Sequence, residues 1–139
     1  MAPLTRSCWQ CGAACELGIG QTVQGGRLVW SAGYRCARCG QMVEEDGWGE
    51  MPTAYREEVL RVQGEWALEV GSAEPRIKVE VVRVLREWLG LTLADAKAYF
   101  DRIPGQVIRG TQAEMMYVKK QLSARGVDVE VRQCSGPTD

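Results

Sequence analysis

Six cysteines are the residues of this chain best suited to chemistry, and four of them form two Cys-x-x-Cys-Gly turns. Two intervening residues let both sulfurs of a turn reach one ion, and the following glycine can adopt positive φ. Two such turns supply the tetrahedral thiolate set that Zn²⁺ accepts at about 2.3 Å. The predicted ligands are Cys8, Cys11, Cys36 and Cys39. Because four protein ligands leave no position for water, we expect a structural Zn²⁺. Disulfides, or free thiols without metal, are the alternative interpretations.

The residues between the two turns indicate small β hairpins. Residues 27–31 and 34–36 alternate as strands do, and glycines at 25–26 and at 33 mark turns. This cysteine-rich segment resembles a zinc ribbon, which we assign to residues 1–50.

The other two cysteines have no paired spacing. Cys15 could compete as a ligand but is better explained as a small buried side chain. Cys134 lies in an expected polar tail, residues 134–139, as a free thiol. Neither has a sequence environment that would lower its pKa, so no redox role is expected.

Composition limits the possible functions. The chain has 139 residues, 45% apolar and 25% charged, with a formal net charge of −1. It has no histidine, which removes the commonest general base, and no catalytic constellation is visible. We therefore expect a protein that is not an enzyme and has no small-molecule substrate. No apolar run is long enough to span a membrane and no secretory signal is visible, so a cytoplasmic location is expected.

Residues 51–75 are expected to connect two small units. Thr53 could cap a helix over residues 54–62. Residues 65–70 alternate with Trp66 and Leu68 on one side, which favours a strand, although a continued helix is the competing interpretation. Residues 71–75 form a linker.

The C-terminal half predicts a compact α/β unit over residues 76–133. We expect a strand at 77–82, a helix at 83–89, and a second helix capped by Thr92. A strand at 106–109 precedes a long helix, which opens with a capping box at Thr111 and ends before Gly126. A last strand covers 127–131. The order βααβαβ predicts a two-layer α+β fold, with helices on one face of a three-stranded sheet.

Three segments of this unit carry a family resemblance: residues 78–86, 90–97 and 126–131. They resemble the C-terminal domain of the bacterial ribosomal stalk protein. This chain departs from that family at Thr92, where the family has a second loop glycine, and at Ala94, where it has lysine. The family's N-terminal dimerisation helices are replaced by the ribbon and the connector.

The resemblance also implies a partner-binding face. In that family, basic residues flanked by apolar ones recruit translational GTPases. The matching positions are Lys78, Val79, Val82, Arg83, Arg86 and Lys97. Arg83 and Arg86 are i, i+3 neighbours on a helix and can contact one acidic patch. Without the resemblance, a solvated basic face would be the preferred interpretation.

These observations favour a protein-binding adaptor that docks an acidic partner, which could be a translation factor or a ribosome-associated protein. An immunity-type inhibitor that neutralises a toxin is a second hypothesis. A nucleic-acid-binding zinc protein is a third, but the acidic residues 44–46 beside Trp48 disfavour contact with phosphates.

Overall fold

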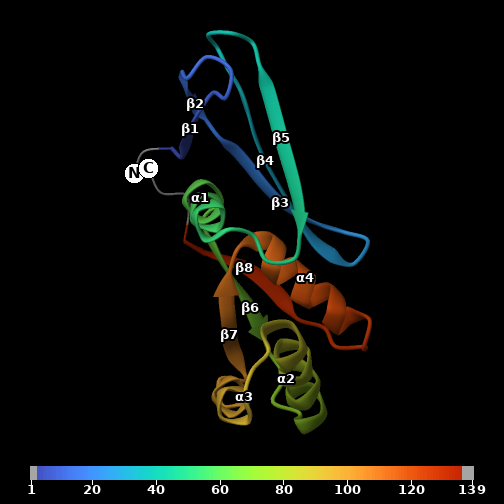
Figure 1. Ribbon diagram of the computed structural model, residues 1–139. Helices are drawn as coiled ribbons and strands as arrows, with labels where there is room; N and C mark the ends of the chain where they lie inside the picture. The colour runs from blue at the N-terminus through green and yellow to red at the C-terminus, as the bar shows by residue number, and fades with distance from the viewer. Residues whose placement is uncertain (1–2, 136–139) are drawn as a thin grey trace.

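The computed structural model describes residues 3–135 and has two units of mixed α and β structure (Figure 1). In the N-terminal unit β1 pairs with β2, and β4 lies between β3 and β5, all antiparallel. The elements of this unit are β1 (Thr5–Ser7), β2 (Ala14–Glu16), β3 (Gly18–Gln24), β4 (Arg27–Arg35), β5 (Met42–Trp48) and α1 (Thr53–Gln63). The expected β hairpins are confirmed, with a turn at residues 25–26. The turn expected at Gly33 is wrong, because residues 27–35 form the single strand β4.

Helix α1 closes the core of the N-terminal unit. Tyr55 and Val59 lie four residues apart on its buried face. They pack in one cluster with Ala32 and Tyr34 of β4 and with Leu17, which lies between β2 and β3. Thr53 is the first residue of α1 and not its cap, since Pro52 holds that position and no side chain caps the helix. The connector helix therefore belongs to the ribbon's core.

The C-terminal unit has the predicted order βααβαβ. Its antiparallel sheet has β6 in the centre, between β7 and β8. The elements are β6 (Glu65–Val70), α2 (Pro75–Leu89), α3 (Leu93–Phe100), β7 (Gly105–Gly110), α4 (Gln112–Ser123) and β8 (Glu130–Ser135). A second core cluster, which includes Leu68, Leu85 and Leu122, fills the space between this sheet and its helices.

The strand predicted at residues 77–82 is wrong, because these residues lie inside α2. Their buried members Val81, Val84 and Leu85 follow helical spacing, and Pro75 stands at the start of the helix. The first strand of the sheet is β6, which lies in the predicted connector. The alternation predicted for it is confirmed, with Leu68 and Val70 buried on one face.

The helix caps predicted at Thr92 and Thr111 are confirmed. The Thr92 hydroxyl accepts from the Asp95 amide at 3.2 Å, and Thr111 forms a complete capping box with Glu114. Gly126 has a φ of 75° in the turn after α4.

The last strand starts later than predicted. Val127 and Val129 are buried ahead of β8. Cys134 therefore lies in a strand and not in a tail. Residues 136–139 of the predicted tail lie outside the described residues.

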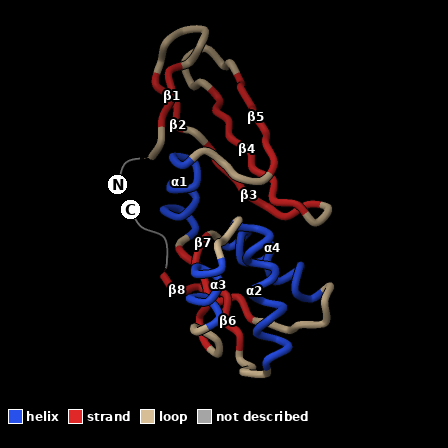
Figure 2. The backbone as a smooth tube through the Cα atoms, turned by 60° about the horizontal axis from the view of Figure 1, so that its bottom comes forward, coloured by secondary structure: helices blue, strands red, loops and turns tan. Residues whose placement is uncertain are grey.

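The two units pack against each other through α4, which lies beneath β3 and β4 in both views (Figures 1 and 2). The buried Thr111 hydroxyl donates to the side-chain oxygen of Gln21 on β3. Arg56 of α1 makes a bidentate contact with Glu114, with both nitrogen–oxygen distances at 2.8 Å. These polar contacts hold the ribbon in one position relative to the sheet unit.

No helix within residues 3–135 combines the length and the apolarity needed to cross a membrane.

Candidate metal centre and docking face

The two cysteine turns have the same backbone geometry. In the first, the Cys8 amide donates to the Ala13 carbonyl at 2.7 Å, and the Gly12 amide donates to the Cys8 carbonyl at 2.9 Å. The second turn repeats both bonds at residues 36–41, each at 2.8 Å. Gly12 and Gly40 have φ values of 76° and 79°, a region that side chains rarely adopt. The glycine after each pair therefore closes the turn around the sulfurs.

The four sulfurs converge on one point. Their mutual separations are all within 4.8 Å, with 3.6 Å between Cys8 and Cys39 and 3.5 Å between Cys11 and Cys36. A tetrahedron with metal–sulfur bonds of about 2.3 Å has edges of about 3.8 Å. All four residues are free cysteines and not disulfides. The donor set and its spacing therefore fit a zinc ion.

The electrostatics of the turns also suit a cation. The Cys39 amide is the main cause that lowers the pKa of Cys36 to about 6, and the Cys11 amide lowers the pKa of Cys8. The Gln41 amide also lowers the pKa of Cys39. Desolvation and the three neighbouring sulfurs outweigh this effect and raise the pKa of Cys39 to about 12. Four thiolates this close repel one another, so all four would ionise together only around a divalent cation.

Cys15 lies outside this group of four. Its side chain is buried in the ribbon's core and its sulfur donates weakly to the Ala13 carbonyl at 3.5 Å. Burial is the main cause that raises its pKa to about 11. A buried neutral thiol is the state expected of a packing residue.

A second candidate site is an open groove of about 710 Å³ between α2 and α3. Four of the six residues predicted from the family resemblance line this groove, namely Val79, Val82, Arg83 and Arg86. The other lining residues are Glu87, Gly90, Leu91 and Phe100. Sequence reasoning missed Leu91 and Phe100. Phe100 has helical spacing with Ala96, which indicates a core position as readily as a groove.

The two remaining predicted residues, Lys78 and Lys97, do not line the groove. The ammonium group of Lys78 lies 4.1 Å from the Phe100 ring centroid, in cation–π contact. Lys97 is exposed on α3 and is not among the lining residues. Arg83 pairs with Glu80 on its own helix at 2.8 Å. Arg86 and Lys97 have no ion pair among residues 3–135, so their charges are available to a partner.

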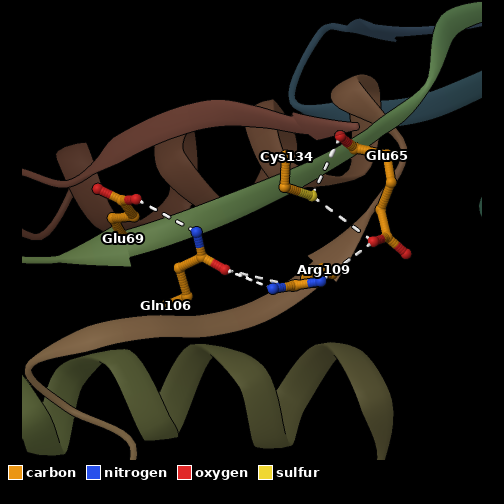
Figure 3. Close-up of polar contacts among 5 residues, drawn as sticks. All are labelled: Glu65, Glu69, Gln106, Arg109 and Cys134. Atoms are coloured by element: carbon orange, nitrogen blue, oxygen red, sulfur yellow. Dashed lines mark hydrogen bonds and ion pairs between the residues drawn. The ribbon is translucent and has the colours of Figure 1, made fainter. Parts of the chain in front are cut away.

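The face of the C-terminal sheet that carries Glu65 and Glu69 holds a polar network (Figure 3). The Cys134 thiol donates to the Glu65 carbonyl at 3.2 Å, and Arg109 lies 3.5 Å from the Glu65 carboxylate. The side-chain oxygen of Gln106 accepts a hydrogen bond from the Arg109 guanidinium at 2.9 Å. The side-chain nitrogen of Gln106 donates to the Glu69 carboxylate at 3.4 Å. Burial and the neighbouring carboxylate raise the pKa of Cys134, which keeps the thiol protonated and unreactive.

The groove between α2 and α3 lies in the part of the chain for which known proteins provide a match. Residues 67–132 match the family model of the ribosomal protein L7/L12 C-terminal domain. The resemblance predicted from the sequence is thereby confirmed. The match begins within β6 and not at residue 76, in agreement with the observed sheet.

Two curated relatives are the large ribosomal subunit protein bL12 of Pseudomonas paraeruginosa (strain DSM 24068 / PA7) and that of Pseudomonas aeruginosa (strain LESB58). Each is 43% identical over 56 residues, which cover 40% of this chain and 46% of the relative. The chain thus spans less than half the length of these relatives. No solved structure gives a significant match.

Proposed function

We propose that this protein is a non-enzymatic adaptor, in which a structural zinc ribbon is fused to an L7/L12-like unit that docks an acidic protein partner. The observation that carries the proposal is the groove between α2 and α3. Val79 and Val82 line it next to Arg83 and Arg86, on the unit that matches the L7/L12 family. Apolar contacts flanked by guanidinium groups suit a partner surface with exposed carboxylates.

The partner class follows from the family. A translational GTPase, or another ribosome-associated protein, is the partner that the L7/L12 resemblance favours, with a cytoplasmic and ribosome-associated location. Zn²⁺ is held by the four sulfurs of Cys8, Cys11, Cys36 and Cys39, where it crosslinks β1–β2 to β4–β5. Its contribution is to folding, because all four ligands come from the protein.

Charge reversal in the groove tests this function. The variant Arg83→Glu/Arg86→Glu should bind a purified elongation GTPase at least about tenfold more weakly, since two attractive contacts become repulsive. Lys119→Glu/Lys120→Glu is the matched control, because both lysines lie on α4 of the same unit and outside the groove lining. Biolayer interferometry measures both affinities, and circular dichroism and zinc content verify folding.

Other outcomes would assign another function. Equal binding by both variants would remove the groove from the interface. Capture of one unrelated protein from the native lysate, in place of GTPases, would favour the immunity-type inhibitor. Binding to RNA that weakens steeply with salt would favour the nucleic-acid protein.

A further inference from the structure

The two cysteine turns belong to different sheets of the ribbon. Residues 8–13 join β1 to β2, which pair only with each other, whereas residues 36–41 join β4 to β5 within the three-stranded sheet. Both turns lie at the same end of the ribbon (Figures 1 and 2). Among residues 3–135, no strand pairing connects the two sheets. The distance between the turns therefore depends on other contacts, and it determines whether the four sulfurs can share one ion.

The second turn is fixed at both ends by its own sheet. Strands β4 and β5 pair over seven residues, and the last of these pairs, Arg35 with Met42, directly flanks the turn. Strands β1 and β2, on either side of the first turn, pair over only three residues. An isolated two-stranded hairpin is marginally stable in water. The first turn therefore needs support from outside its own hairpin.

Tyr34 of β4 gives the first turn this support. Its hydroxyl oxygen accepts a hydrogen bond from the backbone amide of Trp9 at 3.1 Å. Tyr34 is 6% exposed and packs in the same buried cluster as Cys8 and Cys36. It precedes Cys36 by two residues, and side chains two apart lie on the same side of an extended chain. One side chain thus links the backbone of the first turn to the strand that leads into the second.

The hydrogen bond from Trp9 orients the peptide group that follows Cys8. The carbonyl of this group accepts from the Gly12 amide at 2.9 Å, and its N–H is the one that donates to Tyr34. Because both polar ends of the group are held, the backbone that carries the Cys8 side chain is held as well. In the second turn, the corresponding Ala37 amide has no hydrogen-bond partner among residues 3–135.

Another polar contact of the hairpin does not involve a cysteine turn. Arg6 of β1 lies 3.3 Å from the Glu45 carboxylate of β5 and also donates to the Tyr55 hydroxyl of α1. The Arg6 and Glu45 side chains are both exposed, and exposed ion pairs contribute little to stability. This contact anchors the hairpin on the sheet, but the bond to Tyr34 is the one that reaches the turn.

We propose that Tyr34 is a positioning residue of the zinc site, which holds the first cysteine turn at the distance that the second turn requires. The inference rests on the proposed zinc ribbon and goes beyond it, because it assigns metal retention to a residue that is not a ligand. Groups that orient metal ligands from outside the coordination sphere typically change metal affinity by about 10- to 100-fold. Tyr34 bonds the amide beside Cys8 and not its sulfur, so we expect an effect at the lower end of that range.

Chelator competition on the zinc-loaded full chain tests the proposal. The variant Tyr34→Phe keeps the ring and should bind zinc about tenfold more weakly than the wild type, with faster release to the chelator. Tyr55→Phe is the matched control, because Tyr55 is buried in the same cluster and its hydroxyl contacts no residue of either turn. Arg6 keeps its ion pair with Glu45 in this variant, so its zinc affinity should stay within about twofold of the wild type.

A spectroscopic readout separates positioning from a general loss of stability. In the ¹¹³Cd-loaded protein, the metal resonance depends on the geometry of the four sulfurs, so it should shift in Tyr34→Phe. It should stay in place in Thr111→Val, which loses a buried hydroxyl at the contact between the two units and leaves both turns intact. The zinc-loaded wild type gives a test that needs no variant. Its Trp9 amide should exchange with solvent much more slowly than its Ala37 amide.

The outcomes distinguish this inference from the proposed zinc site. Zinc affinity and a ¹¹³Cd resonance that are unchanged in Tyr34→Phe would overturn the role of Tyr34 and leave the zinc site standing. Equally fast exchange of the Trp9 and Ala37 amides in the wild type would overturn it too. A folded wild type that binds neither zinc nor cadmium would refute the zinc site itself, and the role of Tyr34 with it.

Discussion

Replacing Thr111 with valine should destabilise both units, because one hydroxyl serves a helix cap and the interunit contact. The hydroxyl accepts from the Glu114 amide at 3.1 Å and donates to the side-chain oxygen of Gln21. Thr111 is fully buried and Gln21 is 7% exposed. Water therefore cannot replace either bond in the valine variant.

The expected magnitude is the sum of two losses. Removal of a threonine cap costs about 1 kcal/mol. Leaving the oxygen of Gln21 buried without a donor costs about 1–3 kcal/mol. The total for Thr111→Val is about 2–4 kcal/mol, a large part of the stability of a small protein.

Urea unfolding followed by circular dichroism, with the protein saturated with zinc, measures this loss. Thr111→Ser keeps the hydroxyl and should cost only about 1 kcal/mol, for the lost methyl group. Gln21→Leu should reduce the cost of the valine change, because no buried oxygen is then left unpaired. A loss below about 0.5 kcal/mol in Thr111→Val, or strict additivity with Gln21→Leu, would refute the interunit contact as described.

Two further predictions concern the metal and pH. Purified protein should hold one zinc ion per chain, and the Co²⁺-substituted protein should show the absorption of a four-thiolate site. The Cys36→Ser variant should lose that absorption spectrum, whereas the control variant Cys134→Ser should keep it. The pKa of Glu58 is held below its ordinary value of 4.5 mainly by its hydrogen bond to Arg61. Its contribution to stability is therefore present above about pH 4.5 and declines as the pH falls through the lower folded pKa. Urea midpoints at pH 7, 5 and 3 should show a larger loss in the wild type than in Glu58→Gln, and parallel losses would contradict this assignment.

Local signals in the sequence were reliable where the physical cause is itself local. The hydroxyl of Thr92 caps α3 and that of Thr111 caps α4 because each bonds an amide three residues ahead. The two Cys-x-x-Cys-Gly turns close on themselves through bonds within six residues. Such features need no information from the rest of the chain.

Helix α2 shows where sequence reasoning failed. Residues 77–82 contain β-branched side chains at both alternating and helical spacing, so periodicity supports either structure. The core decides, because Val81, Val84 and Leu85 can pack together against the sheet only from a helix. The place of the first strand was then taken by β6, which pairs with two strands from later in the chain.

The lining of the groove between α2 and α3 was partly accessible from the sequence. Family resemblance placed Val79, Val82, Arg83 and Arg86 together, and the groove contains all four. Phe100 required the tertiary structure, because α3 comes from a separate segment and its angle to α2 depends on packing.

The sequence by itself determined the cysteine spacing, the caps of α3 and α4, and the resemblance to the L7/L12 C-terminal domain. These depend on contacts between near neighbours or on patterns retained within one segment. Tertiary structure alone decided how the ribbon sits on α4. That arrangement depends on buried contacts such as Gln21 with Thr111, which are 90 residues apart in the chain. Sequence periodicity and residue spacing cannot predict such pairs, because the contacts form only when the surfaces of the two units meet.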